Sequence, residues 1–508
     1  MLMHFPPQLP DRMERFYVQY IEDWALCNGL CMRDIDNSHA VHAPVTMFPT
    51  PFSKSGFEEA LRIQCAFNEL YFHAATHEEW LLGHLEEAAK HDDFTAKLIQ
   101  IHKAAKAGQT QRLTGGLWRS DYIVNGSRTS LEGRQVKQVE FNTVSVSFGA
   151  LASKVADMHE FLSHASRSWT GHGEVPRNTA LKDLARGLAN MHAGYKVAEI
   201  QHRQATHQTS TSAIEDEDDA SIMDDPVVLF IVQPDETNVM DQRLIEFELV
   251  KEHDIVSYRI SLAEVPDFVV RTNDNRLLHN PSGREIAVVY YRAGYAPSDY
   301  PTDVEWNARE MLESSHAVNC PSTLTQLAGA KKIQQVLTDR SVLTKIAPSL
   351  SSDTVDRLMK TFVKIYPMDD SPEGEQGRYY ALREPDHFVL KPQREGGGNN
   401  IYGEDIPEFL QSIPTESWAA YILMELIEPP KITNRILRAG KLQSGRVVNE
   451  LGVFGTVMWD RDHNELLMNE QAGWLLRTKL QDSHEGGVAA GFGCLDSIQL
   501  MGPLKDDN

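Results

Sequence analysis

The stretch VLKPQREGGGNN, residues 389–400, places Lys391, Arg394 and Glu395 directly in front of three consecutive glycines. Glycine loses much backbone entropy on ordering and is a poor residue for the middle of a helix or strand. The segment FVLKP, residues 388–392, has the composition of a strand that ends at its proline. Backbone N–H groups of glycines can approach an anion closely, Lys neutralises phosphate, and a carboxylate can hold Mg²⁺. The stretch therefore indicates a nucleotide-binding loop, although a glycine-rich turn with solvated charges fits this segment alone equally well.

The bulk composition limits the possible partners. The chain has 508 residues, 41% hydrophobic content and a net charge of −23. Nucleic acids and anionic membranes bind clustered Lys and Arg, so we expect neither as a partner. The longest apolar runs, such as residues 227–232, fall far short of the ~20 residues of a membrane span. Five scattered cysteines without a C-x-x-C pair, and no recognisable signal peptide, favour free thiols and a cytoplasmic location.

Helical and strand-like segments alternate along the chain. Residues 56–106 are predicted to be helical, with a late helix capped by Asp92 or Asp93. Strand-like segments follow at residues 136–141, 227–232, 285–291, 388–392, 421–427 and 451–459. Helical stretches such as LTQLAGAKKIQQVL separate them, which predicts an α/β or α+β fold with more than one sheet. The polar and then acidic residues 203–225 are predicted to form a surface insertion.

Three other stretches also point to a nucleotide. AGAKKIQQ places Lys331 at the start of a helix, where N–H dipoles favour anions. LLRTK sets Arg477 and Lys479 in front of a second loop rich in glycine and alanine. YILMELI and NELGVFG carry Glu425 and Glu450, and they can supply an apolar slot for adenine and a carboxylate for ribose. No P-loop, kinase or zinc-protease motif occurs.

The segment KQVEFNTVSVSFG indicates a second binding region. Strand alternation puts Glu140 and Asn142 on one face, where two oxygen ligands suit Mg²⁺. Ser145 and Ser147 would continue that face with hydroxyl groups for a peptide-like ligand, and the alternative is a strand with a polar exposed face. LWRSDY and VVYYRAGY each place an arginine suited to binding carboxylates at the end of an apolar run: Arg119 and Arg292.

These segments, in this order, resemble the eukaryotic glutathione synthetases, a family of ATP-grasp ligases, and most of all its fungal members. The resemblance runs from about residue 15 to residue 497 and is carried by RSDY, KQVEFNTVSVSFG, NVMDQR, EIAVVYYRAGY, QLAGAKKIQQ, LKPQREGGGNN, YILMELIEP, ELGVFG, LLRTK and EGGVAAG. It implies an α/β (α+β) ATP-grasp fold with mixed sheets, a helical N-terminal part and glycine-rich lid loops. We expect four parts: helices and the start of the main body (1–130), metal and substrate strands with the insertion (131–225), a substrate-binding domain (226–345) and the ATP-grasp domain (346–508).

The resemblance also implies the site residues. Mg²⁺, with two ions per active site, would be held by Glu140, Asn142 and Glu395. ATP would contact Lys331, Lys391, Glu395, Gly396, Gly397, Gly398, Asn399, Asn400, Tyr402, Met424, Glu425, Leu426, Ile427, Glu450, Lys479 and Glu485. The other substrates would contact Arg119, Ser145, Ser147, Glu236, Asn238, Gln242, Arg292, Tyr295, Arg477, Val488 and Ala489. The charges expected to assist catalysis are those of Arg119, Lys331, Lys391 and Arg477.

The activity that the resemblance implies is the second step of glutathione biosynthesis, carried out by a homodimer. ATP would phosphorylate γ-glutamylcysteine, and glycine would displace the phosphate to give glutathione, ADP and phosphate. Many animal members carry Asp at the position of Glu485 and Lys at that of Leu426, and neither difference threatens the activity. Val488 and Ala489 keep the pattern of glycine-using members. The alternatives are a ligase for another amine, a nucleotide-binding scaffold without chemistry, or a small-molecule kinase.

Overall fold

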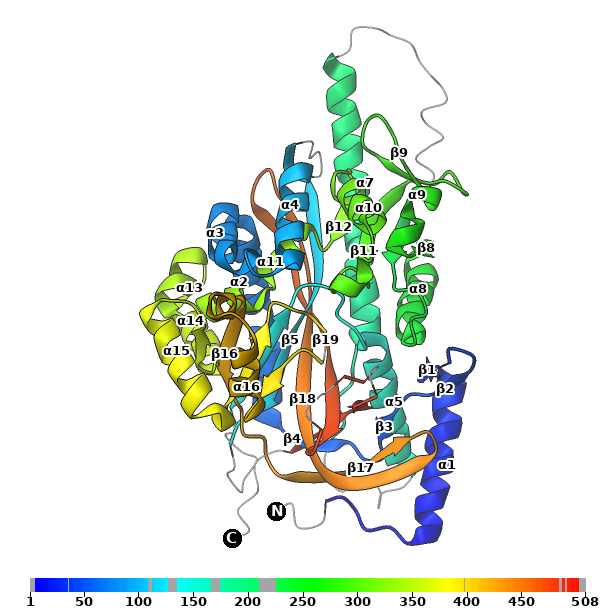
Figure 1. Cartoon of the computed structure of the whole chain (residues 1–508). Coiled ribbons are helices and arrows are strands. Elements are labelled where there is room, and N and C mark those ends of the chain that lie inside the picture. The colour runs from blue at the N-terminus through cyan, green and yellow to red at the C-terminus, as the bar shows by residue number, and fades with distance from the viewer. Residues whose placement is uncertain are drawn as a thin grey trace.

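A computed structural model of the chain describes residues 5–34, 36–107, 112–126, 135–165, 174–209, 225–396, 398–483, 487–488 and 491–501. Long strands of a twisted central sheet run through the middle of the molecule, and helices gather on either side of them (Figure 1). Across the described ranges, no helix combines the length and the apolar character needed to cross a bilayer.

The central sheet has seven strands in the order β17–β3–β20–β19–β18–β5–β6. Their bounds are β3 Val45–Thr46, β5 Leu113–Val124, β6 Val136–Asn142, β17 Ile432–Arg438, β18 Lys441–Asp460, β19 Glu465–Leu480 and β20 Gly493–Asp496. β3 and β20 pair in parallel, and the other neighbours are antiparallel. The sheet therefore joins segments from both ends of the chain, which is why residues far apart in sequence can share one site.

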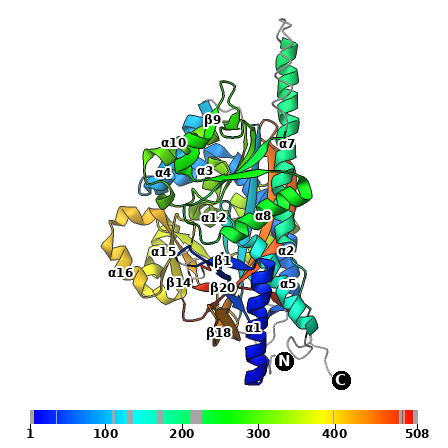
Figure 2. The same cartoon turned by 90° about the vertical axis from the view of Figure 1, so that its right-hand side faces the viewer.

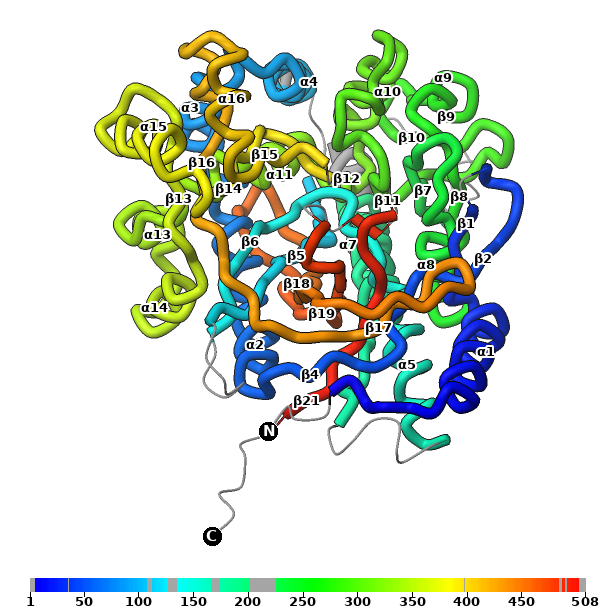
Figure 3. Tube along the Cα trace, turned by 60° about the horizontal axis from the view of Figure 1, so that its bottom comes forward, coloured from blue at the N-terminus to red at the C-terminus, as the bar shows by residue number. Residues whose placement is uncertain are grey.

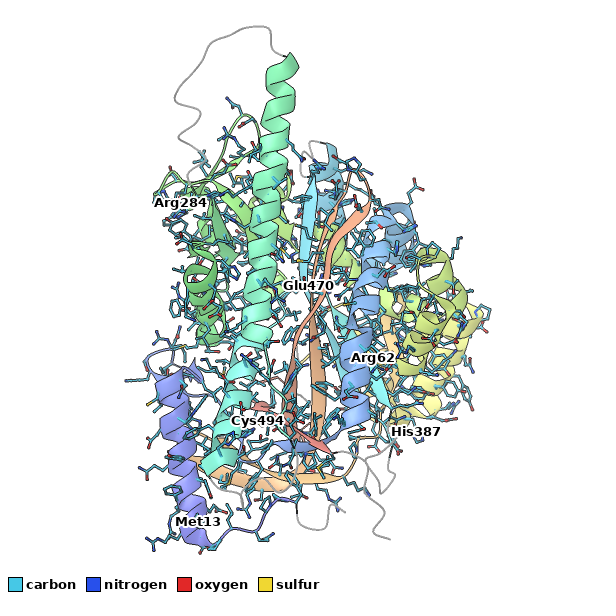
Figure 4. All side chains as sticks on the ribbon, turned by 180° about the vertical axis from the view of Figure 1, so that it is seen from behind. Met13, Arg62, Arg284, His387, Glu470 and Cys494 are labelled. Atoms are coloured by element: carbon cyan, nitrogen blue, oxygen red, sulfur yellow. The ribbon has the colours of Figure 1, made fainter. Side chains whose placement is uncertain are left out.

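Three helices cover one face of this sheet: α2 Lys54–Thr76, α5 Gly149–Ala165 and α7 Ala180–Thr209. Seen from behind, Glu470 lies on the sheet between α7 and α2 (Figure 4). Nη2 of Arg186 donates to its carboxylate at 3.2 Å. α7 rises above the rest of the molecule (Figure 2). The predicted surface insertion at 203–225 is thus helical as far as Thr209, because α7 continues into it, and residues 210–224 lie outside the described ranges.

Two four-stranded sheets flank the central strands on opposite sides, with β14 and β16 on one side and β11 on the other (Figure 3). The first is parallel, in the order β12–β11–β7–β8: β7 Val227–Ile231, β8 Ser257–Ile260, β11 Ile286–Tyr291 and β12 Val318–Cys320. The second is antiparallel, in the order β13–β16–β14–β15: β13 Ile365–Pro367, β14 Phe388–Pro392, β15 Ile401–Tyr402 and β16 Tyr421–Glu425.

The remaining elements surround these three sheets. The other helices are α1 Asp11–Asn28, α3 Glu78–Ala89, α4 Asp93–Ala107, α8 Val239–His253, α9 Val265–Phe268, α10 Asp303–Glu313, α11 Thr323–Ala328, α12 Lys331–Leu337, α13 Arg340–Ile346, α14 Ser352–Thr361, α15 Pro372–Arg383 and α16 Asp405–Ser412. Three two-stranded pairs complete the fold: β1 Cys31–Arg33 with β2 Ala40–His42, β4 Thr50–Ser53 with β21 Ile498–Met501, and β9 Val269–Arg271 with β10 Leu277–His279.

The sequence predicted the kinds of elements well and their bounds less well. Every predicted strand lies on a strand, and residues 56–106 are helical in three pieces, with Asp92 accepting from the N–H of Thr95. Two expectations are wrong in detail. Arg119 lies in the middle of β5, because that strand continues past it to Val124. Ser145 and Ser147 follow β6 in a loop, since the strand ends at Asn142 and Ser145 has a positive φ of 51°.

Candidate active site

A cavity of about 720 Å³ opens where the central sheet, the antiparallel sheet and the start of α12 meet. The loop that follows β6 closes one side of it. Most of the predicted site residues line this one cavity: Arg119, Glu140, Asn142, Ser145, Ser147, Tyr295, Lys331, Lys391, Glu395, Gly396, Asn399, Asn400, Tyr402, Met424, Glu425, Leu426, Ile427, Glu450, Arg477, Lys479 and Val488. The structure therefore brings the nucleotide set and part of the substrate set into one place.

At the centre of the cavity a buried lysine bridges two carboxylates. Nζ of Lys331 lies 3.2 Å from Oε2 of Glu140 and 3.1 Å from Oε1 of Glu395. Burial disfavours the charged lysine, but the two carboxylates outweigh this effect and raise the pKa of Lys331 above its ordinary value. Nζ of Lys391, which is also buried, donates to the carbonyl oxygen of Val139 at 3.0 Å. Burial lowers the pKa of Lys391, in contrast to that of Lys331. A positive charge held in low dielectric acts strongly on an anion.

The two carboxylates differ in their electrostatic surroundings. Burial favours the neutral form of Glu140, but the charges of Lys331, Lys391 and Arg477 outweigh it and lower the pKa of its carboxyl well below the ordinary value. Burial raises the pKa of Glu395, and the negative charge of Glu140 adds to this shift against the opposing charge of Lys331. Such paired carboxylates compete for one neighbouring cation, and a metal ion would relieve the repulsion between them.

The apolar part of the cavity matches the expectation of a slot for a flat ring. Val389 and Met424 face each other across β14 and β16, and Tyr402 and Ile427 pack against the same small cluster. The strand ends at Glu425, so Leu426 and Ile427 lie just beyond it and not on it as predicted. Because Leu426 donates its N–H to the carbonyl of His387, the segment stays aligned beside β14 and keeps an extended edge at the cavity.

The glycine-rich loop has the backbone that the sequence led us to expect. Gly396 and Gly398 have positive φ angles of 82° and 91°, which residues with a Cβ rarely adopt. A Cβ on Gly396 would lie 3.4 Å from the ring of Tyr295, so the loop lies against the opposite wall of the cavity. Gly398 does not line the cavity. Three other predicted residues fall outside the described ranges: Gly397, Glu485 and Ala489.

Arg394 lines the same cavity, and its guanidinium also contacts an acid of the helical N-terminal part. Its Nη2 lies 2.5 Å from Oδ1 of Asp92, a buried residue directly before α4. Its neighbour Gln393 is buried too, accepting the N–H of Lys332 at 3.0 Å and donating to the carbonyl of Ala420 at 3.1 Å. These contacts fix the root of the glycine-rich loop on both sides.

Four predicted substrate residues lie beside the cavity without lining it. Glu236 accepts from the N–H of Asn238 and from Nε2 of Gln242, at 2.8 and 3.1 Å. Arg292 pairs with Asp241 at 3.4 Å. Burial opposes the charge of Arg292, but Tyr290, Asp241 and Glu236 raise the pKa of its guanidinium. The buried Oδ1 of Asn238 accepts no hydrogen bond from any described residue.

Two carboxylates that the sequence reasoning missed organise the walls. Asp241 on α8 accepts the N–H groups of Phe148, Ala150 and Leu151. It thereby fixes the end of the loop after β6 and the start of α5 to α8. Asp121 is fully buried behind the cavity and contacts Arg119, Asn142 and Arg477. Both lie within the quoted motifs NVMDQR and RSDY, so an unexplained acid inside a functional motif was the available signal.

The oxygen donors present fit Mg²⁺. Glu140, Asn142 and Glu395 line the same cavity from two walls. Among the described residues no group of three or more His, Cys, Asp or Glu could hold a metal ion by itself. Mg²⁺ does not require such a cage, because it binds one or two carboxylates and takes its remaining ligands from phosphate and water.

A second hollow, of about 1030 Å³, lies elsewhere, between α12, α13, α14 and β13. None of the predicted site residues lines it. It lacks the paired carboxylates and buried lysines of the first cavity, so the smaller cavity is the candidate active site.

The comparisons with known proteins agree with this geometry. The family model described as "Eukaryotic glutathione synthase, ATP binding domain" matches residues 11–500. Over 94% of this chain, the sequence is 38% identical to the "Glutathione synthetase large chain" of Schizosaccharomyces pombe, covering 96% of that protein. It is also 38% identical to the "Glutathione synthetase" of Homo sapiens, where 94% of each chain is covered.

The fold has a solved counterpart. A glutathione synthetase like-effector from Globodera pallida in the apo form superposes with a TM-score of 0.72 over 97% of this chain and 98% of that one, at 19% identity. This likeness shows the fold, and together with the family match it places the chain among the ATP-dependent ligases of the ATP-grasp type. The family match over almost the whole length shows more, and the chain belongs to the eukaryotic glutathione synthase family.

Proposed function

We propose that this chain is an ATP-dependent carbon–nitrogen ligase that joins γ-glutamylcysteine to glycine, giving glutathione, ADP and phosphate. The family match over residues 11–500 supports the reaction. The observation that carries it is the single cavity in which Lys331 bridges Glu140 and Glu395 beside an apolar slot and two arginines. A nucleotide and an acidic acceptor can lie there side by side.

The first step needs a carboxylate and a polyphosphate to approach each other. A carboxylate is a poor acyl donor because oxide is a poor leaving group, and phosphorylation gives it a good one. Lys331, Lys391 and Lys479 surround the place where the phosphates would lie and neutralise their charge. Arg119 on β5 and Arg477 on β19 lie on either side of β18 in the same wall and can stabilise charge on the acyl oxygens.

Mg²⁺ would be held by Glu140, Asn142 and Glu395, and it would supply charge neutralisation of the phosphate oxygens when bound. Two ions per site remain a proposal from the resemblance. Lys331 lies between Glu140 and Glu395 and would add its positive charge beside the phosphates.

The second step is attack by the amine of glycine on the acyl carbon, with phosphate as the leaving group. No side-chain nucleophile is required. The reactive acyl phosphate must be protected from water, and closure of the glycine-rich loops over the loaded site would do this. Gly396 and Gly398 support this role because, without a Cβ, their backbone can come close to a ligand.

The test is ADP release by the purified protein with Mg²⁺, ATP and γ-glutamylcysteine, with and without glycine, and identification of the product by mass. We expect glycine-dependent ADP release and glutathione. Lys331→Met should abolish the glycine-dependent ADP release. Lys345 is an exposed lysine on α13, and Lys345→Met is the matched control. ADP release only with β-alanine or serine would identify a ligase for another amine. ATP binding without turnover with any amine would refute the proposed ligase activity.

A homodimer is proposed from the resemblance and from one surface. The aromatic rings of Phe16 and Tyr20 on α1 stack at 5.3 Å, and Tyr20 contacts Phe161 of α5 at 5.7 Å. All three side chains are exposed in the single chain, an arrangement typical of a surface that a second copy covers. Light scattering of the native protein and of Phe16→Glu would test this, since the charged variant should be monomeric.

The cytoplasmic location and the four-part division also remain proposals. All five cysteines are free, which supports a reducing compartment. Fractionation of the native cells, with immunodetection of the chain, tests the location. Limited proteolysis tests the proposed boundaries near residues 130, 225 and 345.

A further inference from the structure

Asp121 lies on β5 directly behind the wall of the active-site cavity. It is fully buried and does not line the cavity, so it cannot contact a substrate there. Its carboxylate accepts Nε and Nη2 of Arg119 at 2.5 and 2.7 Å. It also accepts Nδ2 of Asn142 at 3.0 Å and Nη2 of Arg477 at 3.1 Å. One carboxylate thus contacts three site residues from three different strands.

The contact with Asn142 decides which way its amide points. The two N–H bonds of that amide are directed to the carbonyl of Arg119, at 3.2 Å, and to Asp121. Its oxygen is therefore the atom that remains for the cavity. A flipped amide would set its oxygen against the carboxylate of Asp121 and leave buried groups unsatisfied, which costs about 1–3 kcal/mol. Asp121 thereby selects the orientation in which Asn142 can act as an oxygen ligand.

The contacts with the arginines have a second consequence. Arg119 and Arg477 carry like charges beside one buried site, and each would repel the other without a negative charge between them. Asp121 supplies that charge and holds Arg119 by two hydrogen bonds, which fixes the plane of its guanidinium. Glu450, opposite Arg477 on the neighbouring strand, holds the second guanidinium from the cavity side.

We propose that Asp121 is a positioning residue of the ligation, holding the Asn142 amide oxygen toward the metal ion and the Arg119 and Arg477 guanidiniums toward the acyl group. This inference rests on the proposed function. It assigns to Asp121 an effect on metal affinity and on kcat that is separate from its effect on folding. Residues that orient metal ligands from behind typically change metal affinity by about 10- to 100-fold when they are replaced.

The experiment compares Asp121→Asn with Glu313→Gln. Glu313 is an equally buried carboxylate that contacts Arg309 and the N–H of Thr323, outside the cavity, so it controls for loss of a buried charge. Mn²⁺ replaces Mg²⁺ as the probe, and its affinity is measured by electron paramagnetic resonance with a non-hydrolysable ATP analogue. Thermal unfolding and the kcat and KM for γ-glutamylcysteine are measured on the same samples.

We expect Asp121→Asn to lower the affinity for Mn²⁺ by at least tenfold and kcat by at least 100-fold. Glu313→Gln should lose similar stability and keep both the affinity and kcat within twofold of the native values. Adding Asn142→Ala to Asp121→Asn should lower the Mn²⁺ affinity only slightly more, because both changes act through the same amide oxygen. Unchanged Mn²⁺ affinity and kcat in Asp121→Asn at reduced stability would overturn the proposal.

A second variant and a separate product assay complete the experiment. If Asp121→Asn does not fold, Asp121→Glu keeps the charge but displaces it, and the same loss of Mn²⁺ affinity is expected; native affinity in that variant would overturn the inference. The product assay on the native chain is read separately. A native chain that binds Mn²⁺ with the analogue but makes no glutathione refutes the proposed function, while the affinity ratio still decides the role of Asp121 at the metal.

Discussion

The ion pair between Arg394 and Asp92 ties the root of the glycine-rich loop to the helical N-terminal part. Nη2 of Arg394 lies 2.5 Å from Oδ1 of Asp92, and its guanidinium lies 5.7 Å from the ring of Phe94. The other carboxylate oxygen of Asp92 accepts the N–H of Thr95 at 3.2 Å. The side chain of Asp92 is 4% exposed and that of Arg394 is 26% exposed. We predict that this pair holds the loop in register for ATP.

The geometry sets the size of the effect. Removing one partner of a fully buried pair costs about 3–5 kcal/mol, whereas an exposed pair contributes about 0–1 kcal/mol. With one buried and one partly exposed partner, we expect a coupling free energy of about 2 kcal/mol. Because about 1.4 kcal/mol is a factor of ten, this corresponds to about 30-fold in an equilibrium constant. That factor is the upper limit for the rise in the KM for ATP.

The assay is a double-mutant cycle of Arg394→Ala and Asp92→Asn, with urea unfolding and ATP kinetics on each variant. Asp92→Asn keeps an oxygen for the N–H of Thr95, so it removes mainly the charge. Both single variants should raise the KM for ATP, and the double variant should be no worse than either. The exposed pair Arg340 with Asp356 is the control, where the coupling should stay below about 1 kcal/mol.

One result would refute this reasoning. If Arg394→Ala lowers kcat strongly while Asp92→Asn leaves the kinetics native, the guanidinium acts on phosphate and not through α4. A coupling free energy near zero would lead to the same conclusion.

Three other predictions follow from single sites. Lys391→Met should lower ADP release by at least about 100-fold, since a buried cation beside the phosphates is lost, with calorimetry showing a folded chain; native turnover would contradict its role. Gly374→Ala should destabilise by about 3 kcal/mol or more in urea, because its Cβ would lie 2.0 Å from the carbonyl of Asp369, whereas Gly83→Ala in α3 meets nothing and should stabilise by about 0.5–1 kcal/mol. Burial lowers the pKa of His159 from 6.5 to about 4, so the unfolded chain takes up a proton first and stability falls as the pH drops below 6.5. Between pH 6.5 and 5.0 the native chain should lose about 1.6 kcal/mol more than His159→Gln, and equal losses would show that His159 is not neutral in the fold.

The parts of the site that depend on adjacent residues were predictable from the sequence. β14 and its glycine-rich loop can be predicted from a branched apolar run, a proline and the glycines that follow. The position of Lys331 at the start of α12 can be predicted from the residues around it. The face that carries Glu140 and Asn142 can be predicted from the alternation along the strand. Each of these features is local, because a few consecutive residues determine it.

The long strand β5 was not predictable in the same way. Its sequence LTGGLWRSDYIV contains two glycines that favour a turn, and only the short apolar run in front of Arg119 was recognised from the sequence. In the structure a Cβ on Gly115 would lie 2.5 Å from the sulfur of Met191 on α7. The glycine therefore serves the close approach of a helix that begins more than sixty residues later, and tertiary packing outweighs its local preference.

The position of Asp121 shows where sequence reasoning ends. Alternation alone puts Arg119 and Asp121 on one face of β5, so their pairing was within reach. Asn142 reaches them through the register of β5 with β6, where it stands opposite Arg119. Arg477 comes from 356 residues away, on a strand that reaches β5 only across β18. A slip of one residue in either register would turn these side chains to the other face. The groups that bind metal and acyl oxygen are thus arranged by the pairing of distant strands, and the buried carboxylate between them is the residue through which that pairing reaches the chemistry.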